Sequence, residues 1–228
     1  MCKADNMVQI SQQAKQILRR PDALEQVRAM QVILEEEARK RHEFREWLDE
    51  DVKAEFINGE IVLHSPVKKR HWQASMLLSR LLSFYVDIND LGQVGVEKVM
   101  IELTRNDYEP DICFFSKEKA STFADDQMLF PAPDLVVEIL SKKTTKNDRG
   151  IKKEDYAAHG IREYWIIDPI KQIVEQYFLL DEHSEEYFQP YIHRIDDDIS
   201  SRVLVGFTIP VRAIFEQKTN IETLKKLV

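Results

Sequence analysis

The sequence predicts a mixed α/β domain with a central sheet flanked by helices, preceded by a helical extension at the N-terminus. Residues 1–48 contain one proline and no glycine, which is typical of helices. From residue 55 onward, short β-prone segments bounded by turn residues alternate with helical periodicity. Residues 134–140 form a short and almost continuous apolar run, as expected for a strand buried on both faces. A central sheet of several strands with few long helices follows from these observations.

The composition excludes several classes of protein. A chain of 228 residues can bury a substantial core without disulfides or structural metals. With 32% charged and 43% hydrophobic residues, it is neither an integral membrane protein nor a low-complexity chain. Because 40 acidic residues outnumber 32 basic ones, the net charge is -8. This argues against a protein that coats nucleic acid indiscriminately, but it allows an enzyme with one local basic patch.

The cysteines and the N-terminal residues set the expected compartment. The two cysteines, Cys2 and Cys113, form no CxxC pair and indicate neither a disulfide framework nor a zinc site. Cys113 lies in an apolar run and is expected to be a small buried core residue. Residues 1–16 show no apolar stretch typical of a secretory signal, and no membrane-spanning run is present. We therefore expect a cytoplasmic protein without a membrane partner.

The N-terminal extension is predicted to contain a long helix over about 22–48. The sequence also allows a shorter helix before it. Pro21 and Asp22 suit a first helical turn. Apolar residues then recur every three or four positions, at Leu24, Val27, Met30, Leu34 and Ala38. This stripe indicates packing, either against the domain itself or against a second subunit.

The first strands form a predicted hairpin. Asn58-Gly59 separates two β-prone segments, which is the strongest short signal for a two-residue turn. The turn pairs residue 57 with 60 and residue 55 with 62. Glu55 and Glu60 then share one face, whereas Phe56 lies on the opposite, apolar face.

The remaining elements follow in order. A helix is predicted over 71–87, then strand residues between 94 and 103 whose alternation changes phase near 97–98, which indicates a bulge. A strand over 111–115, a loop over 116–133 and the buried strand 134–140 come next. A helix over 148–159 ends at Gly160. A hairpin joins 164–167 to 173–178, and weaker strands near 187–193 and 203–209 precede a helical C-terminus.

Glu138 is the first chemical anomaly, because a carboxylate inside an apolar strand is costly unless it is paired or bound to a metal. Asp111 begins another apolar strand. If the strands are neighbours, the two carboxylates repel by about 4 kcal/mol at an effective dielectric of 20, and a divalent cation reverses this. The alternatives are an ion pair for Glu138 and a turn cap for Asp111. Asp134 is expected to cap the end of its strand.

A basic segment follows the strand of Glu138. Six cations occur between Lys142 and Lys153. Asp148, Lys152 and Tyr156 recur at four-residue steps and share one helical face. Such a segment is usually a solvated face, but next to a metal–carboxylate site it suits binding of a phosphodiester. Lys142, Lys143 and Arg149 are the predicted phosphate contacts.

Several motifs together resemble one known family. They are Glu55-x-x-Asn58-Gly59-Glu60, Ser65-Pro66, His71, Pro110-Asp111, the block 133–141, Asp148-x-x-x-Lys152-x-x-x-Tyr156 and the block 160–169. This order is similar to the Uma-type branch of the PD-(D/E)XK nuclease superfamily, over roughly residues 42–216. The resemblance implies a restriction-endonuclease-like fold. It also implies a division into an extension (1–41), a nuclease-like domain (42–216) and a helical tail (217–228).

The resemblance also implies roles for particular residues. Asp111 and Glu138 would hold a catalytic Mg²⁺ or Mn²⁺ ion. The lysine that the superfamily often carries two residues after the glutamate is replaced by Leu140, so Lys152 from the next helix is the expected catalytic lysine. Glu55 or Glu60 would complete the acidic site, and the sequence does not choose between them. His71 and Tyr156 are candidate accessory residues, with structural roles as the alternative. Lys142 replaces a proline usual in this branch.

The expected function is therefore metal-dependent hydrolysis of DNA phosphodiester bonds, with DNA bound through a local basic patch. The alternatives are a catalytically inactive nucleic-acid-binding domain and a protein-interaction domain of the same fold. Because cleavage of both strands needs two active sites, a homodimer formed through the helix over 22–48 is expected. The competing interpretation is that this helix folds back over its own sheet.

Overall fold

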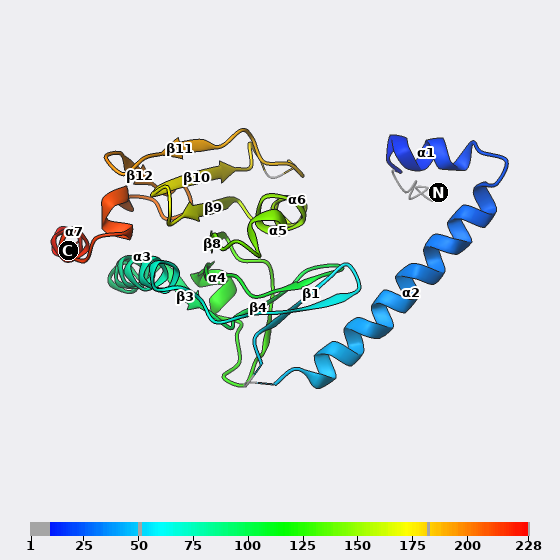
Figure 1. Cartoon of the computed structure of the whole chain (residues 1–228), viewed down its shortest axis with the longest axis horizontal. Coiled ribbons are helices and arrows are strands. Elements are labelled where there is room, and N and C mark those ends of the chain that lie inside the picture. Colours follow the sequence, from blue (N-terminus) through cyan, green and yellow to red (C-terminus); the bar gives the residue numbers. More distant parts are fainter. Residues whose placement is uncertain (1–9, 50–51, 182, 228) are drawn as a thin grey trace, which may run out of the picture.

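The structure, a computed structural model, describes residues 10–49, 52–181 and 183–227 (Figure 1). Its body contains a six-stranded sheet in the order β11-β10-β9-β8-β6-β3. The bounds of these strands are β3 (Gly92–Val96), β6 (Ile112–Ser116), β8 (Leu135–Ile139), β9 (Glu163–Asp168), β10 (Ile173–Phe178) and β11 (Tyr191–His193). Only β8 and β9 pair in parallel within this sheet, and α5 (Thr145–Arg149) and α6 (Ile151–Ala158) connect them.

A second sheet lies beside the first and has the order β2-β1-β5-β4-β7. Its strands are β1 (Ala54–Ile57), β2 (Glu60–Leu63), β4 (Met100–Glu102), β5 (Asp107–Tyr108) and β7 (Leu129–Phe130). A two-stranded ribbon of β12 (Asp198–Ser200) and β13 (Thr208–Pro210) completes the strands of the described residues. The mixed α/β class is confirmed, but the strands form two larger sheets rather than one.

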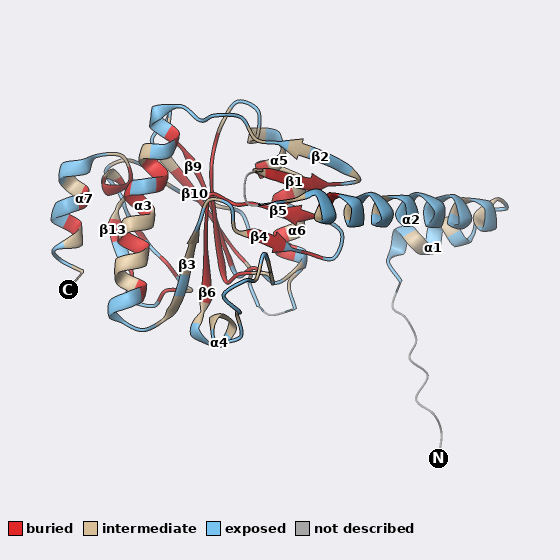
Figure 2. Cartoon of the chain, turned by 90° about the horizontal axis from the view of Figure 1, so that it is seen from below, coloured by how far each residue is buried: buried red, intermediate tan, exposed pale blue. Residues whose placement is uncertain are grey.

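Both faces of the six-stranded sheet are covered. Figure 2 shows its buried strands between α3 (Lys69–Ile88) on one side and the second sheet on the other. One core packs α3 and η1 (Val211–Ile214) against residues such as Val137 and Trp165. The other core packs α6 and the second sheet against Val136 and Tyr164. Because β8 is covered on both sides, its five residues are all buried, which explains its unbroken apolar sequence. Helix α7 (Gln217–Leu224) packs on α3 and η1.

The two N-terminal helices, α1 (Gln12–Leu18) and α2 (Ala23–Trp47), form an arm that projects from the body (Figure 1). Only the last turns of α2 are anchored. Phe44 is buried against Phe56, with ring centroids 5.7 Å apart. Arg41 and Arg45 both bind the carboxylate of Asp107, at 2.6 and 2.7 Å. The predicted apolar stripe is exposed, so the interpretation that this helix covers its own sheet is wrong.

Several sequence-based boundaries need correction. The phase change at 97–98 is no bulge, because the chain leaves β3 in one sheet and enters β4 in the other, turning at Glu97 with φ of 56°. The predicted loop over 116–133 contains α4 (Lys117–Ala120) and β7. The predicted helix over 148–159 is divided at Gly150, whose φ and ψ of -111° and -109° are not helical. Residue pairing in the first hairpin is as predicted, Ile57 with Glu60 and Glu55 with Val62.

Candidate active site

Lys152 is the centre of a buried group of charges between the two sheets. It projects from α6, is 1% exposed and donates to Oε1 of Glu138 at 2.9 Å. Its ammonium also lies 2.6 Å from Oε1 of Glu55 on β1. Burial lowers the pKa of Lys152, but Glu138, Glu55 and Asp148 outweigh burial and hold it well above its usual value. Lys152 is therefore charged at neutral pH.

Glu138 lies on the face of β8 that points toward the second sheet. Its Oε1 accepts a second hydrogen bond from the hydroxyl of Tyr156 at 3.0 Å, one helical turn beyond Lys152. Burial raises the pKa of Glu138 well above its usual value, and the neighbouring Asp148 and Asp111 add to this, against the opposing effect of Lys152. The ionised form of Glu138 is therefore disfavoured unless further positive charge compensates it.

Asp111 is brought to Glu138 by strand pairing. Ile112 on β6 pairs with Val137 on β8, so Asp111 and Glu138 occupy the next positions of neighbouring strands. Oδ2 of Asp111 accepts from the backbone N–H of Ile139 at 2.7 Å and lies 3.3 Å from Nε2 of His71 on α3. Although burial raises the pKa of Asp111, His71 lowers it and the net shift is downward. Asp111 therefore stays ionised beside Glu138.

Glu55 is the residue of the first hairpin that reaches this group, whereas Glu60 is exposed at the start of β2. Besides Lys152, Glu55 accepts from the backbone N–H of Glu109 at 3.0 Å, and its Oε2 lies 3.4 Å from Nε2 of His64. Burial raises the pKa of Glu55, but Lys152 and His64 outweigh it and hold the pKa at about 2. The structure thus separates two glutamates that the hairpin pattern left equivalent.

Asp148 and Glu109 add further buried acid. Asp148 on α5 is 1% exposed, and its Oδ1 lies 3.7 Å from the ammonium of Lys152, beyond hydrogen-bonding distance. Burial raises the pKa of Asp148 to about 6 and that of Glu109 to about 7. Carboxylates outnumber cations here, so this interior would gain free energy from another positive charge.

The model of the family Uma2, described as "Putative restriction endonuclease", matches residues 41–212. The chain belongs to the Uma2 family. No curated protein matches it. The crystal structure of a putative nuclease belonging to DUF820 from Anabaena variabilis is similar, with a TM-score of 0.65 and 17% identity. That alignment covers 76% of this chain and 96% of the other, and it establishes a shared fold.

Within this Uma2 protein, the sequence-predicted site residues separate into two groups. Six of them meet inside the body, around Lys152 and Asp111: these are Asp111, Glu138, Lys152, Glu55, His71 and Tyr156. Lys142 and Lys143 are exposed after β8, and Lys143 donates to Oγ of Ser65 at 3.0 Å. Arg149 is bound by the carboxylate of Glu175 on β10. Asp134 accepts from the backbone N–H of Ser116 at 2.8 Å, which agrees with a capping role.

Sequence reasoning missed three contributors to the charged interior, Asp148, His64 and Glu109. The four-residue spacing places Asp148 on the same helical face as Lys152 and Tyr156, but a solvent-exposed face is equally consistent with this spacing. His64 and Glu109 carry no local signal, because their approach to Glu55 depends on how the second sheet packs against the first.

The donor set suits a hard divalent cation. Asp111 and Glu138 supply carboxylate oxygens, which Mg²⁺ and Mn²⁺ prefer, and their surroundings carry an excess of buried negative charge. Among the residues that the structure describes, no three His, Cys, Asp or Glu side chains converge on one point as a complete metal cage. Mg²⁺ commonly uses only one or two protein carboxylates together with water and substrate phosphate, so the pair fits such a site.

Proposed function

We propose that this protein is a metal-dependent endonuclease that hydrolyses DNA phosphodiester bonds. The observation that carries the proposal is the buried Lys152, held by Glu138 and Glu55 beside Asp111. A buried cluster of lysine and carboxylates is a poor device for stability alone, because replacing the whole cluster by apolar residues of similar volume usually stabilises an interior at least as well. The burial of Lys152 among these carboxylates therefore favours a chemical role. A cytoplasmic location suits a DNA substrate.

Asp111 and Glu138 would hold a Mg²⁺ or Mn²⁺ ion. When bound, this cation would lower the pKa of water and neutralise charge on the phosphate. The protein's own groups would do the rest. Lys152 would orient the attacking water and stabilise the negative charge that develops on the phosphate oxygens. His71 fixes Asp111, Tyr156 fixes Glu138, and Glu55 keeps the ammonium of Lys152 in place.

DNA would approach through the exposed lysines next to this site. Lys142 and Lys143 follow β8 directly, and phosphate contacts there would place the backbone near Asp111 and Glu138. Arg149 is already engaged by Glu175, so its contribution to phosphate binding requires that this ion pair opens.

The decisive experiment is cleavage of supercoiled plasmid with Mg²⁺ or Mn²⁺ against an EDTA control. We expect nicked or linear product only with metal, and loss of at least a hundredfold in rate for Asp111→Asn and Glu138→Gln. Glu55→Gln should also reduce the rate, whereas Glu60→Gln, an exposed carboxylate of the same hairpin, should not. Full cleavage by Asp111→Asn would refute the assignment.

A second readout is independent of turnover. Binding of a divalent cation to the folded state raises the midpoint of thermal unfolding by mass action. We expect millimolar Mg²⁺ or Mn²⁺ to raise the melting temperature of the wild type but not of Asp111→Asn. Without such a shift, the inactive binding or interaction domain becomes the better interpretation.

We also propose a homodimer formed through the arm. Leu24, Val27, Met30 and Leu34 are between 41% and 65% exposed, although they lie along one side of α2. A second copy of the same arm would cover such a stripe and would supply the second active site that cleavage of a duplex needs.

A further inference from the structure

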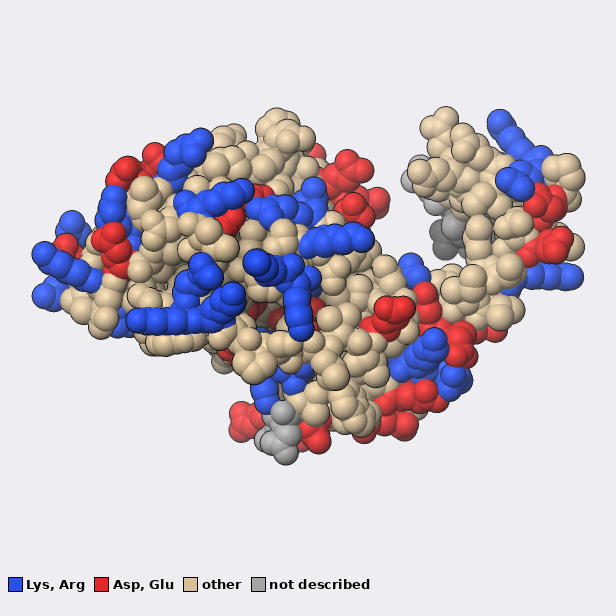
Figure 3. Space-filling model, viewed as in Figure 1, with Lys and Arg blue, Asp and Glu red and all other residues tan. Residues whose placement is uncertain are grey.

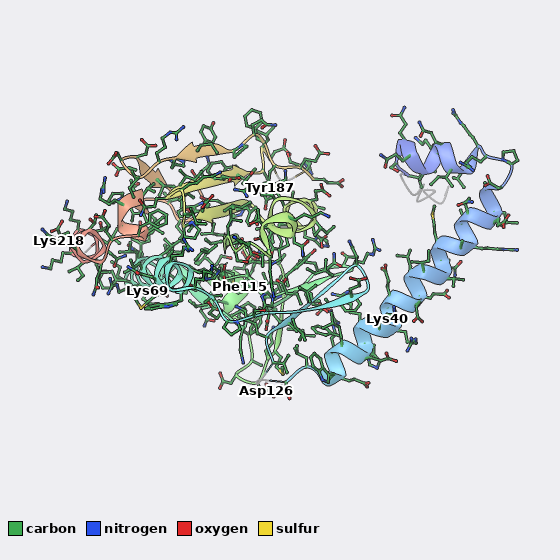
Figure 4. The ribbon with its side chains drawn as sticks, in the orientation of Figure 1. Lys40, Lys69, Phe115, Asp126, Tyr187 and Lys218 are labelled. Carbon is green, nitrogen blue, oxygen red and sulfur yellow. The ribbon has the colours of Figure 1, made fainter. Side chains whose placement is uncertain are left out.

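The start of α3 carries a cationic segment that lies outside the predicted site residues. Lys68, Lys69 and Arg70 are consecutive and all exposed, and no acidic residue occurs between His64 and His71. The chain as a whole carries a net charge of -8, so this concentration of positive charge is a local exception. Figure 3 shows Lys and Arg side chains gathered over the face of the body, and Figure 4 labels Lys69 on α3.

This segment lies next to the candidate active site. His71, the next residue, is buried and lies 3.3 Å from Asp111, so the first turn of α3 borders the carboxylates directly. The other basic segment, over 142–146, follows the strand of Glu138. The hydrogen bond from Lys143 to Ser65 links this segment to the loop that leads into residues 68–70. Cations are therefore present on two sides of Asp111 and Glu138.

Trp72 adds a different kind of surface to the same turn. Its side chain is 45% exposed, although a tryptophan normally gains much free energy from burial. An exposed indole among cations is the combination used by proteins that bind single-stranded nucleic acid, in which bases stack on aromatic rings and phosphates meet lysine and arginine.

We propose that the first turn of α3 is a DNA-binding surface, in which residues 68–70 contact backbone phosphates and Trp72 stacks on an unpaired base. This inference rests on the proposed function and extends it to a substrate class, DNA with a single-stranded region. The phosphates held by residues 68–70 and 142–146 would then flank the bond to be cleaved, which places that bond beside Asp111 and Glu138.

The first test measures binding of fluorescent DNA in EDTA, so that hydrolysis does not interfere. The variant K68E/K69E/R70E is compared with K218E/K225E/K226E, which carries the same change of charge on exposed lysines in and after α7. Figure 4 places Lys218 there. We expect at least tenfold weaker binding for the α3 variant and less than a twofold change for the α7 variant. Neutral glutamine substitutions at 68–70 should also lower the dependence of affinity on salt.

The second test uses single-stranded and duplex DNA with Trp72→Ala. We expect about tenfold weaker binding of single strands and little change for duplex. Trp47→Ala removes another exposed tryptophan, on the arm, and should change neither. Equal binding by the two charge variants overturns the assignment of this surface but leaves the nuclease proposal intact. Unchanged single-strand binding by Trp72→Ala overturns the stacking. A wild type that neither binds nor cleaves DNA refutes both proposals.

Discussion

The interior around Lys152 and the arm of α1 and α2 differ in which side chains they bury and which they expose to solvent. The interior buries charge: Glu55, Glu138, Asp148 and Lys152 are each no more than 5% exposed. The arm exposes apolar side chains, with Leu24 at 65% and Leu34 at 51%. Each arrangement is costly for an isolated chain, so each indicates something that the chain acts on or binds.

The two costs are compensated in different ways. Excess negative charge in the interior is compensated by cations, either Lys152 or a bound metal. The free-energy cost of the exposed apolar surface on the arm is reduced only when another apolar surface covers it. Substitutions in the two regions should therefore differ in their effect on the free energy of unfolding, which is expected to be largest in the charged interior and smallest on the arm.

Lys152→Met should have the largest effect. It removes the cation that contacts Glu138 and Glu55 while keeping a side chain of similar length. Breaking a buried ion pair on one side costs about 3–5 kcal/mol. Urea denaturation at pH 7 without metal should show this loss.

Lys153→Met is the matched control. Lys153 is partly exposed, and its ammonium lies 5.6 Å from the ring centroid of Tyr177. We expect a change below about 1 kcal/mol for this cation–π contact. Equal losses in both variants would show that Lys152 is not the group that compensates the carboxylates.

Asp107→Asn should loosen the anchor between arm and body, with a loss of about 2 kcal/mol, less than for a fully buried pair because Arg41 and Arg45 are partly exposed. Burial raises the pKa of Asp107, but Arg41 and Arg45 outweigh it and the net pKa is lowered. The contribution of Asp107 is therefore complete above its ordinary pKa of 3.8 and is lost as the pH falls through the lower folded value. Acid unfolding curves of both proteins measure this, and they should converge at the acid end.

Tyr156→Phe should cost about 1–2 kcal/mol, because Glu138 loses one of its two hydrogen-bond donors while the ring is kept. Tyr191→Phe, at a half-exposed ring on β11, is the control and should change little. Thermal unfolding of both variants checks the prediction, and equal melting temperatures for wild type and Tyr156→Phe would contradict it.

Leu34→Glu should have the smallest effect on unfolding of the body, below about 0.5 kcal/mol, because the side chain is exposed. It should instead convert a dimer to a monomer in light scattering at micromolar concentration. Val32 is also exposed but lies on the opposite side of α2, so Val32→Glu should leave the dimer intact. A wild-type monomer would refute the proposed association.

Features determined by local periodicity were predictable from the sequence. The hairpin around Asn58-Gly59, the buried strand of Glu138 and the long α2 follow from alternation, turn chemistry and apolar spacing. The division of the strands between two sheets was not predictable. It depends on pairings between segments distant in sequence, such as Phe56 with Asp107, and alternation alone cannot distinguish a bulge from a passage between sheets.

The charged interior was predictable where a charged residue occurs within an apolar segment. Glu138 in an apolar strand and a cation one helix later were sufficient to indicate a charged interior. The choice of Glu55 over Glu60 could not be predicted from the sequence, because both residues lie on one face of the hairpin. The structure distinguishes them by position, since Glu60 adjoins the turn and is exposed while Glu55 lies under the neighbouring sheet.

The order of charges along the chain has a consequence for how the protein folds. Glu55, Asp111, Glu138 and Asp148 all precede Lys152, so a growing chain contains every acid of the site before the cation that pairs with Glu55 and Glu138. Lys152 lies on the crossover between the parallel strands β8 and β9, which is a slowly forming, non-local connection. Closure of this crossover is therefore expected to limit the rate of folding. Mild acid, which protonates these carboxylates, should reduce their mutual repulsion and accelerate that step.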